Sequence, residues 1–250
     1  MECVTTTLEA RQGPPPAAAR PLRLRLAFFA AVTILAASNV VSNRIWPEGY
    51  LLWNVAMTGL LLVGARVAVG LTWEDLGLHR PRLRRGVVVG AAVAASVAVV
   101  YTIALSMPAT RSAFLDERAA GPLAVALFAA LIRIPLGTAM LEETAFRGVL
   151  PALVGGGWWR ATLVSSGLFG LWHVLPSIGM GNANAAFGAA FGGWGALAEI
   201  AVAVLFTFGA GIWLCALRRW SGHLVAPMLA HVATNSFGVL IAWWMITHAS

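Results

Sequence analysis

Seven long apolar stretches alternate with short polar or glycine-rich segments along this chain. They lie at residues 22–41, 50–69, 86–107, 122–154, 158–175, 194–217 and 224–247. Because a helix needs about 20 apolar residues to cross the hydrocarbon core of a bilayer, the pattern predicts about seven to eight membrane spans. Arg23 and Arg25 near the start of the first stretch also suit a signal segment, but the long tail before them favours a span.

The composition excludes a water-soluble globule. Hydrophobic residues make up 59% of the 250 residues and charged residues 11%, with a mean hydropathy of +0.79. Soluble domains carry about 25% charged residues. In lipid, backbone groups must be satisfied within helices or closed barrels, and the stretches have the length of helices. The expected fold class is therefore all-α, a polytopic transmembrane helical bundle with an intramembrane polar cavity.

The arginines indicate which side of the membrane each loop faces. With the amino terminus in the cytoplasm, 12 of the 17 arginines fall in inner segments and 3 in outer loops. Inner loops carry an excess of basic residues, so the bias favours a cytoplasmic amino terminus. We assign the net charge of +7 to this topology and expect no nucleic-acid partner. Residues 1–21 predict a disordered cytoplasmic tail, and residues 73–85 an amphipathic inner loop on the lipid surface.

Three charged residues lie inside the fourth apolar stretch, far from any polar loop: Glu142, Glu143 and Arg147. An ionisable group at mid-bilayer costs roughly 2.5–3.5 kcal/mol on insertion scales, so all three need partners. Glu143 and Arg147 are four residues apart and share a helix face, which predicts an ion pair. Glu142 points about 100° away from Glu143 and needs hydrogen-bond donors of its own. A purely structural ion-pair cluster between helices is the alternative.

Two histidines also lie inside apolar stretches, His173 in the fifth and His231 in the seventh. Asn235 follows His231 by four residues and shares its helix face, as Phe169 does with His173. A single membrane histidine is usually explained by an interhelical hydrogen bond. Two of them, with an unpaired glutamate and an amide at compatible depths, instead predict one polar layer within the bilayer.

These residues resemble the three motifs of the CPBP family, which comprises the type II CAAX prenyl endopeptidases and the bacteriocin-processing and immunity (Abi) membrane proteases. The family patterns are EExxxR, FxxxH and HxxxN or HxxxB. They occur here in order and without substitution, from Glu142 to Arg147, Phe169 to His173 and His231 to Asn235. The resemblance covers roughly residues 122–247, which would form a CPBP-type catalytic membrane core after N-terminal transmembrane helices at 22–121.

The resemblance implies a role for each residue. Glu142 would be the general base that activates a water molecule, and His173 would hold the same water. His231 and Asn235 would stabilise the oxyanion of the tetrahedral intermediate. Glu143, Arg147 and Phe169 would be supporting residues. The implied activity is that of an intramembrane endopeptidase acting on a membrane-associated protein or peptide.

A catalytic metal is the main mechanistic alternative. Glu142, His173 and His231 form a three-ligand nitrogen and oxygen set with an open fourth position, as in catalytic Zn²⁺ sites. We favour a mechanism that requires no cofactor, because no HExxH motif supplies two ligands from one helix. Two other functions stay open: a non-catalytic membrane scaffold or immunity factor, and a proton-coupled transporter with a buried relay. Arginine without lysine suggests a GC-rich gene, and hence a bacterial cytoplasmic membrane.

Overall fold

The computed structural model describes residues 19–248, of which helices form 87% with no β-strand among them. Six helices within this range are long and apolar enough to cross a membrane. The protein is thus a polytopic helical bundle, as expected. The main helices are α1 (Ala19–Val40), α2 (Tyr50–Val63), α3 (Leu83–Ser106), α5 (Leu123–Phe128), α6 (Met140–Glu143), α7 (Leu150–Val154), α8 (Trp158–Trp172), α12 (Ala196–Ser221) and α13 (Val225–His248).

The expected number of seven to eight spans is not confirmed, and the difference lies at the fifth apolar stretch. That stretch forms α8, which has only 15 residues and ends at Trp172. At about 1.5 Å per residue it is too short to cross the hydrocarbon core alone. Pro176 is a local reason for the early end, because it lacks the N–H that would bond to the Trp172 carbonyl. Asn39 Nδ2 donates to that carbonyl instead, at 2.8 Å.

The fourth apolar stretch is one continuous helix of 32 residues, Leu123–Val154. It widens into π-helical turns at η7 (Ala129–Ala139) and η8 (Thr144–Val149). Pro135 lies within the first wide segment and Pro151 follows the second, so each removes a regular helical hydrogen bond nearby. Wide turns of this kind often occur at functional sites. The two segments flank the short regular helix α6, which carries Glu142 and Glu143.

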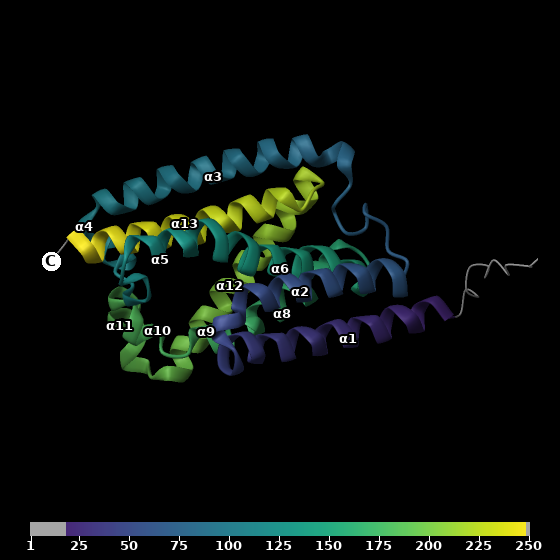
Figure 1. Cartoon of the computed structure of the whole chain (residues 1–250), viewed down its shortest axis with the longest axis horizontal. Helices are drawn as coiled ribbons and strands as arrows, with labels where there is room; N and C mark the ends of the chain where they lie inside the picture. Colours follow the sequence, from purple (N-terminus) through teal and green to yellow (C-terminus); the bar gives the residue numbers. More distant parts are fainter. Residues whose placement is uncertain (1–18, 249–250) are drawn as a thin grey trace, which may run out of the picture.

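The long helices lie roughly side by side in Figure 1, with α3 along one edge and α13 between α3 and the helix of the fourth stretch. Small residues allow the close approach of α3 and α13. A β-carbon on Gly86 would lie 2.7 Å from Val225 Cγ1, and one on Gly90 would lie 2.9 Å from Leu229 Cδ1. The outer face of α3 exposes Val87, Val88 and Ile103, which suits contact with acyl chains.

Two polar segments outside the spans have more regular structure than a flexible loop. Residues 182–195, expected to form a flexible outer loop or re-entrant segment, contain parts of α10 (Met180–Ala183), α11 (Ala185–Phe191) and a 3₁₀ turn. The inner segment 73–85 buries Leu76 completely in the core. The remaining short helices are α4 (Pro108–Arg111) and α9 (Val174–Ser177). The expected tail lies outside the described residues up to residue 18, and its last three residues belong to α1.

Candidate active site

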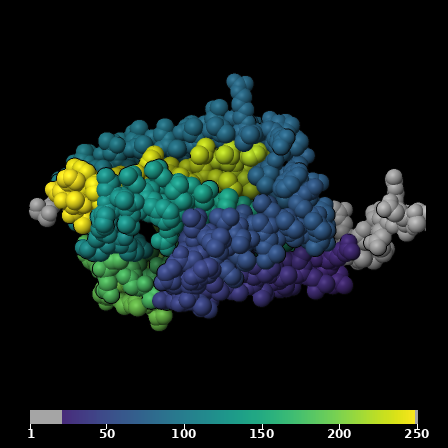
Figure 2. All heavy atoms as spheres, viewed as in Figure 1, coloured from purple at the N-terminus to yellow at the C-terminus, as the bar shows by residue number. Residues whose placement is uncertain are grey.

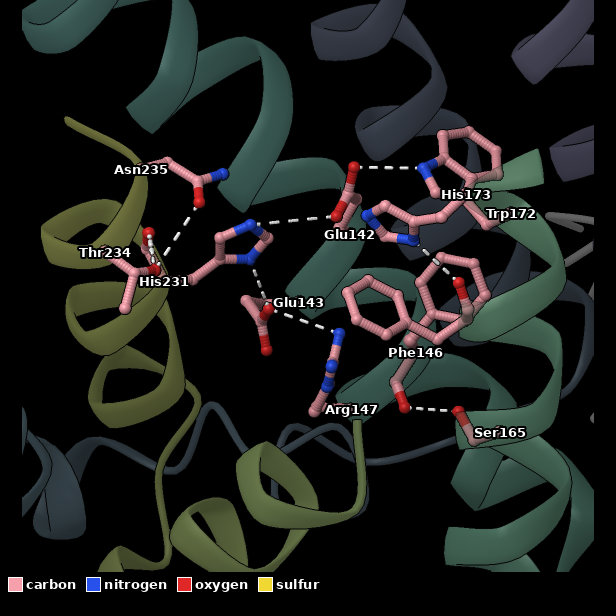
Figure 3. Close-up of polar contacts among 11 residues, drawn as sticks. Glu142, Glu143, Phe146, Arg147, Ser165, Trp172, His173, His231, Thr234 and Asn235 are labelled. Carbon is pink, nitrogen blue, oxygen red and sulfur yellow. Dashed lines mark hydrogen bonds and ion pairs between the residues drawn. The ribbon is translucent and has the colours of Figure 1, made fainter. Parts of the chain in front are cut away.

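Three separate segments bring the acids and histidines of the sequence motifs together in the interior of the bundle. Glu142 and Glu143 lie on α6, His173 lies between α8 and α9, and His231 lies on α13. Figure 3 shows these side chains directed toward one another. The single polar layer expected from the compatible depths of these residues is therefore present as one cluster of side chains.

The carboxylate of Glu142 is buried and its two oxygens have different surroundings. Oε1 accepts a hydrogen bond of 2.9 Å from the indole Nε1 of Trp172. Oε2 has no hydrogen-bond partner and lies 3.8 Å from His231 Nε2. A separation of this length leaves room for a water molecule that bridges the two atoms. Glu142 thus has one fixed oxygen and one oxygen free for chemistry.

Trp172 was not expected as a site residue, although it directly precedes His173. Its ring is buried and packs edge-on against Phe146, with ring centroids 5.8 Å apart. A buried tryptophan N–H usually has a hydrogen-bond acceptor. The signal available in the sequence was therefore a tryptophan inside an apolar stretch, in the same chain as a glutamate that needs a donor.

Glu143 holds two positively ionisable partners at once. Its Oε1 lies 3.2 Å from Arg147 NH1, so the ion pair expected four residues apart is present. The same oxygen accepts a hydrogen bond of 2.7 Å from His231 Nδ1. Glu143 therefore links Arg147 to His231 and orients the imidazole ring, in addition to the supporting contact that the resemblance implied.

Phe169 lies at the centre of the aromatic packing around the site. The Arg147 guanidinium lies over its ring, 3.9 Å from the centroid. The His173 ring packs against it edge-on at 4.6 Å and the His231 ring at 6.4 Å. Such cation–π and edge-to-face contacts fix ring orientations in a buried setting. One phenylalanine thus positions residues from all three motifs.

His173 is half-buried at the end of α8, with backbone angles φ −84° and ψ 0°. This bridge region of backbone space is sparsely populated and common among active-site residues. Nδ1 donates to the Phe169 carbonyl at 2.8 Å. A neutral ring held in this way keeps a lone pair on Nε2, and Figure 3 shows that edge of the ring directed toward Glu142.

Asn235 is exposed at the next turn of α13 after His231. Within the described residues, its side chain makes one hydrogen bond, a long one of 3.5 Å from Thr234 Oγ1 to Asn235 Oδ1. Figure 3 shows its amide on the same side of His231 as Glu142. Asn235 therefore borders the space beside the cluster but makes no hydrogen bond to its acids or histidines.

No group of three His, Cys, Asp or Glu side chains within residues 19–248 is arranged to hold a metal ion. His231 uses Nδ1 for Glu143, at 2.7 Å, and has Nε2 3.8 Å from Glu142 Oε2. A carboxylate contact at Nδ1 also orients zinc-binding histidines, so the metal-dependent alternative stays open. The preference for a mechanism without a cofactor stays a prediction.

Comparison with known proteins identifies the region that carries this cluster. Residues 124–237 match the family model for the type II CAAX prenyl endopeptidase Rce1-like proteins. The match supports a CPBP-family protease domain in this part of the chain. No curated protein shows significant similarity to the chain. No solved structure does so either.

The match includes every motif residue from Glu142 to Asn235, and with it the α6, α8 and α13 segments. This Rce1-like match implies a protease and supports intramembrane endopeptidase activity in general. Six apolar spans make the chain an integral membrane protein.

Proposed function

We propose that this protein is an intramembrane endopeptidase in which Glu142 activates water to hydrolyse a peptide bond of a membrane-associated protein or peptide. The observation that carries the proposal is the asymmetry of the Glu142 carboxylate. Trp172 fixes Oε1, whereas buried Oε2 has no partner and faces His231 Nε2 at 3.8 Å. A general base needs such an unshielded oxygen, held within reach of the proton that it removes.

The two histidines suit different parts of the reaction. A neutral His173 has a lone pair on Nε2 that can accept one hydrogen of the water, while Glu142 Oε2 accepts the other. His231 donates through Nδ1 to Glu143, so its Nε2 donates only when the ring is an imidazolium. In that form Arg147 and His231 balance the charges of Glu142 and Glu143. The imidazolium Nε2–H and the Asn235 amide are then donors for an oxyanion.

The proposed hydrolysis proceeds in two steps. The water oxygen attacks the peptide carbonyl carbon, its proton passes to Glu142 Oε2, and the carbonyl oxygen becomes an oxyanion near His231 and Asn235. The tetrahedral intermediate then collapses, the C–N bond breaks, and the departing nitrogen takes the proton from Glu142. One water is consumed and Glu142 regains its charge, as a general acid–base mechanism requires.

A substrate chain needs a path to this buried site. Figure 2 shows a hollow in one face of the molecule, bordered by α5 in teal, the α10–α11 segment in green and the start of α2 in blue-purple. We propose that a substrate segment reaches Glu142 through this hollow. The expected location is a bacterial cytoplasmic membrane with the amino terminus inside.

The decisive experiment compares Glu142→Gln with the wild type in the membranes of cells that express either protein. We expect peptide termini that depend on the wild-type protein to disappear with Glu142→Gln, since losing a general base lowers rates roughly 10²- to 10⁴-fold. The matched control is Glu74→Gln, which removes an exposed glutamate paired with Arg82. Cleavage by Glu142→Gln at the wild-type rate would refute the proposal. Wild-type termini identical to those of an empty host would favour a non-catalytic scaffold.

The cofactor question needs a separate measurement on the purified wild-type protein. We expect cleavage of a substrate found in the membrane comparison to persist after exhaustive chelation, with metal content measured on the same sample. Activity that disappears with the metal and returns with stoichiometric Zn²⁺ would instead establish the metal-dependent alternative. The Glu142→Gln variant does not distinguish the two mechanisms, because both require the Glu142 carboxylate.

A further inference from the structure

A second polar site lies on the other side of Arg147, outside the cluster described above. It is a cavity of about 440 Å³ between the start of α8, the end of α12 and the inner segment before α3. Cavities of this size accommodate small ligands. Arg147 reaches it from η8, and Arg218 and Arg219 reach it from α12.

The charges that line the cavity are unbalanced. Arg218 and Arg219 face one acid, Asp75, whereas Arg147, which also lines the cavity, is paired with Glu143. Asp75 Oδ2 is occupied by the backbone N–H and the hydroxyl of Thr72, both at 2.7 Å. Within the described residues, neither Arg218 nor Arg219 has a carboxylate within ion-pair distance. The cavity therefore has an uncompensated positive charge.

Buried donors in the cavity wall also lack acceptors. Arg147 is completely buried, yet none of its three guanidinium nitrogens makes a hydrogen bond within the described structure. Its only charged partner is Glu143, through NH1. Arg218 Nε is likewise buried without an acceptor, although NH2 donates to the Asp75 backbone carbonyl at 2.6 Å. Such orphaned charged donors are rare and indicate that an acceptor group binds there.

The amino terminus of α8 adds to the anion-binding character. The helix begins at Trp158 after Gly157, which has a φ of +95° and offers no side-chain cap. Both residues line the cavity. The first backbone N–H groups of a 15-residue helix are thus without a capping side chain, and they carry the positive end of the helix dipole. Arginine side chains and a helix amino terminus together form a typical site for a phosphate group.

The remaining wall of the cavity is apolar and includes Leu24 on α1, Leu71 and Ala152. A ligand that contacts both the basic and the apolar parts of the wall has an anionic group joined to a hydrocarbon chain. We propose that this cavity binds the phosphate group of an anionic phospholipid, such as phosphatidylglycerol, from the leaflet at the arginine-rich end of the bundle. Basic pockets between membrane helices bind anionic lipid headgroups in this manner. Free inorganic phosphate shares the same chemistry and is the other source.

The test measures lipid binding to the purified full-length protein in detergent by native mass spectrometry. Phosphatidylglycerol, phosphatidylcholine and inorganic phosphate are added separately to the wild type and to Arg218→Gln/Arg219→Gln. We expect one phosphatidylglycerol per wild-type chain and binding about tenfold or more weaker in the double variant, since each charge-assisted hydrogen bond contributes roughly ten- to hundredfold. The matched control is Arg84→Gln/Arg85→Gln, two exposed arginines outside the cavity.

Further variants keep the test valid if the double variant does not fold, and they distinguish the possible outcomes. Arg219→Gln alone changes an exposed residue, and Ala152→Leu narrows the cavity without changing charge. Each should weaken phosphatidylglycerol binding, whereas Glu142→Gln should bind as the wild type does. Binding of inorganic phosphate alone would support the anion site with a soluble ligand. Equal loss in the cavity and control double variants, or no preference of the wild type for an anion, would overturn the proposal.

Discussion

The two sides of Arg147 form contrasting polar environments within one membrane protein. On the α6 side, Glu143 and His231 lie within a network of short contacts, and acids and bases are equal in number when His231 is charged. On the α12 side, Arg218 and Arg219 line a cavity with a single acid that is already occupied. The same arginine therefore borders a charge-balanced network on one side and a cavity with excess positive charge on the other.

The two environments suggest two different roles, catalysis on the α6 side and ligand binding on the α12 side. In the charge-balanced network, Glu142 Oε2 and Glu143 Oε2 both lack a hydrogen-bond partner, and Glu142 Oε2 is the one that faces His231 Nε2, at 3.8 Å. Hydrogen-bond donors without acceptors around an open cavity instead indicate a binding site for a ligand that supplies the acceptors. The catalytic proposal follows from the first pattern and the lipid proposal from the second.

The largest expected effect is on stability, from removing the charge that both sides share. Arg147→Met should lower the free energy of unfolding by about 3–5 kcal/mol, because it breaks a fully buried ion pair and leaves the Glu143 carboxylate with His231 as its one remaining partner. Thermal melting of the purified protein, with the yield of folded protein, measures this effect. The double variant Glu143→Gln/Arg147→Met should recover much of the loss, since neither charge then remains.

Arg133→Met is the control for that comparison. Arg133 is exposed and stacks over Tyr50 at 4.5 Å without a carboxylate partner in the described structure. Its loss should change the melting temperature much less. A double variant as unstable as Arg147→Met would mean that the arginine stabilises the fold through the Phe169 ring or the cavity, rather than through Glu143.

The next effect is catalytic and concerns the fixed oxygen of Glu142. Trp172→Phe keeps an aromatic ring against Phe146 but removes the N–H that donates to Oε1. A hydrogen bond to a charged group is worth about 1.5–3 kcal/mol, so we expect cleavage to slow by roughly ten- to hundredfold. The initial rate of cleavage of an identified substrate measures the effect, and thermal melting reports on folding.

Trp53→Phe provides a matched control, because Trp53 Nε1 donates to Ser38 Oγ at 2.9 Å, far from the acids in sequence and on α2. It should leave the cleavage rate unchanged. If Trp172→Phe also cleaves at the wild-type rate, the indole does not position the base, and the orientation of Glu142 must come from the helix alone.

The helix spacing in the sequence predicted the charged contacts but not the tryptophan. Glu143 and Arg147 meet because residues four apart share a helix face, and that rule needs no tertiary structure. The same geometry turned Glu142 away from them and required a separate donor. Which donor it would be depended on how α8 packs against α6, and no periodicity within either helix contains that information.

The span count shows a similar limit for the fold. Hydropathy located every apolar segment, because burial in lipid selects composition over some twenty residues. It could not show that the fifth segment stops at Trp172, since the break depends on Pro176 and on Asn39 from another helix. The unbalanced arginine cavity was also out of reach, because its walls come from four segments far apart in sequence.

The smallest expected effect is a pH dependence at the arginine-rich end. His223 lies between α12 and α13, and its Nδ1 accepts a hydrogen bond from the Val225 N–H at 3.1 Å. Burial lowers the pKa of His223, and the nearby positive charge of Arg218 and the His79 ring lower it further. The unfolded chain thus binds a proton more readily than the folded protein. Stability from neutral His223 is fully present above the ordinary histidine pKa, near 6.5, and declines as the pH falls below it.

Thermal melting between about pH 5.5 and 7.5 tests this expectation, with His223→Gln as the comparison. The wild type should lose more stability toward acid pH than His223→Gln, which has no proton to gain at this position. Arg218→Gln should reduce the difference, because it removes part of the positive charge that opposes protonation of His223. Identical pH profiles for the wild type and His223→Gln would mean that His223 takes up a proton as readily in the folded protein as in the unfolded chain, and would contradict this expectation.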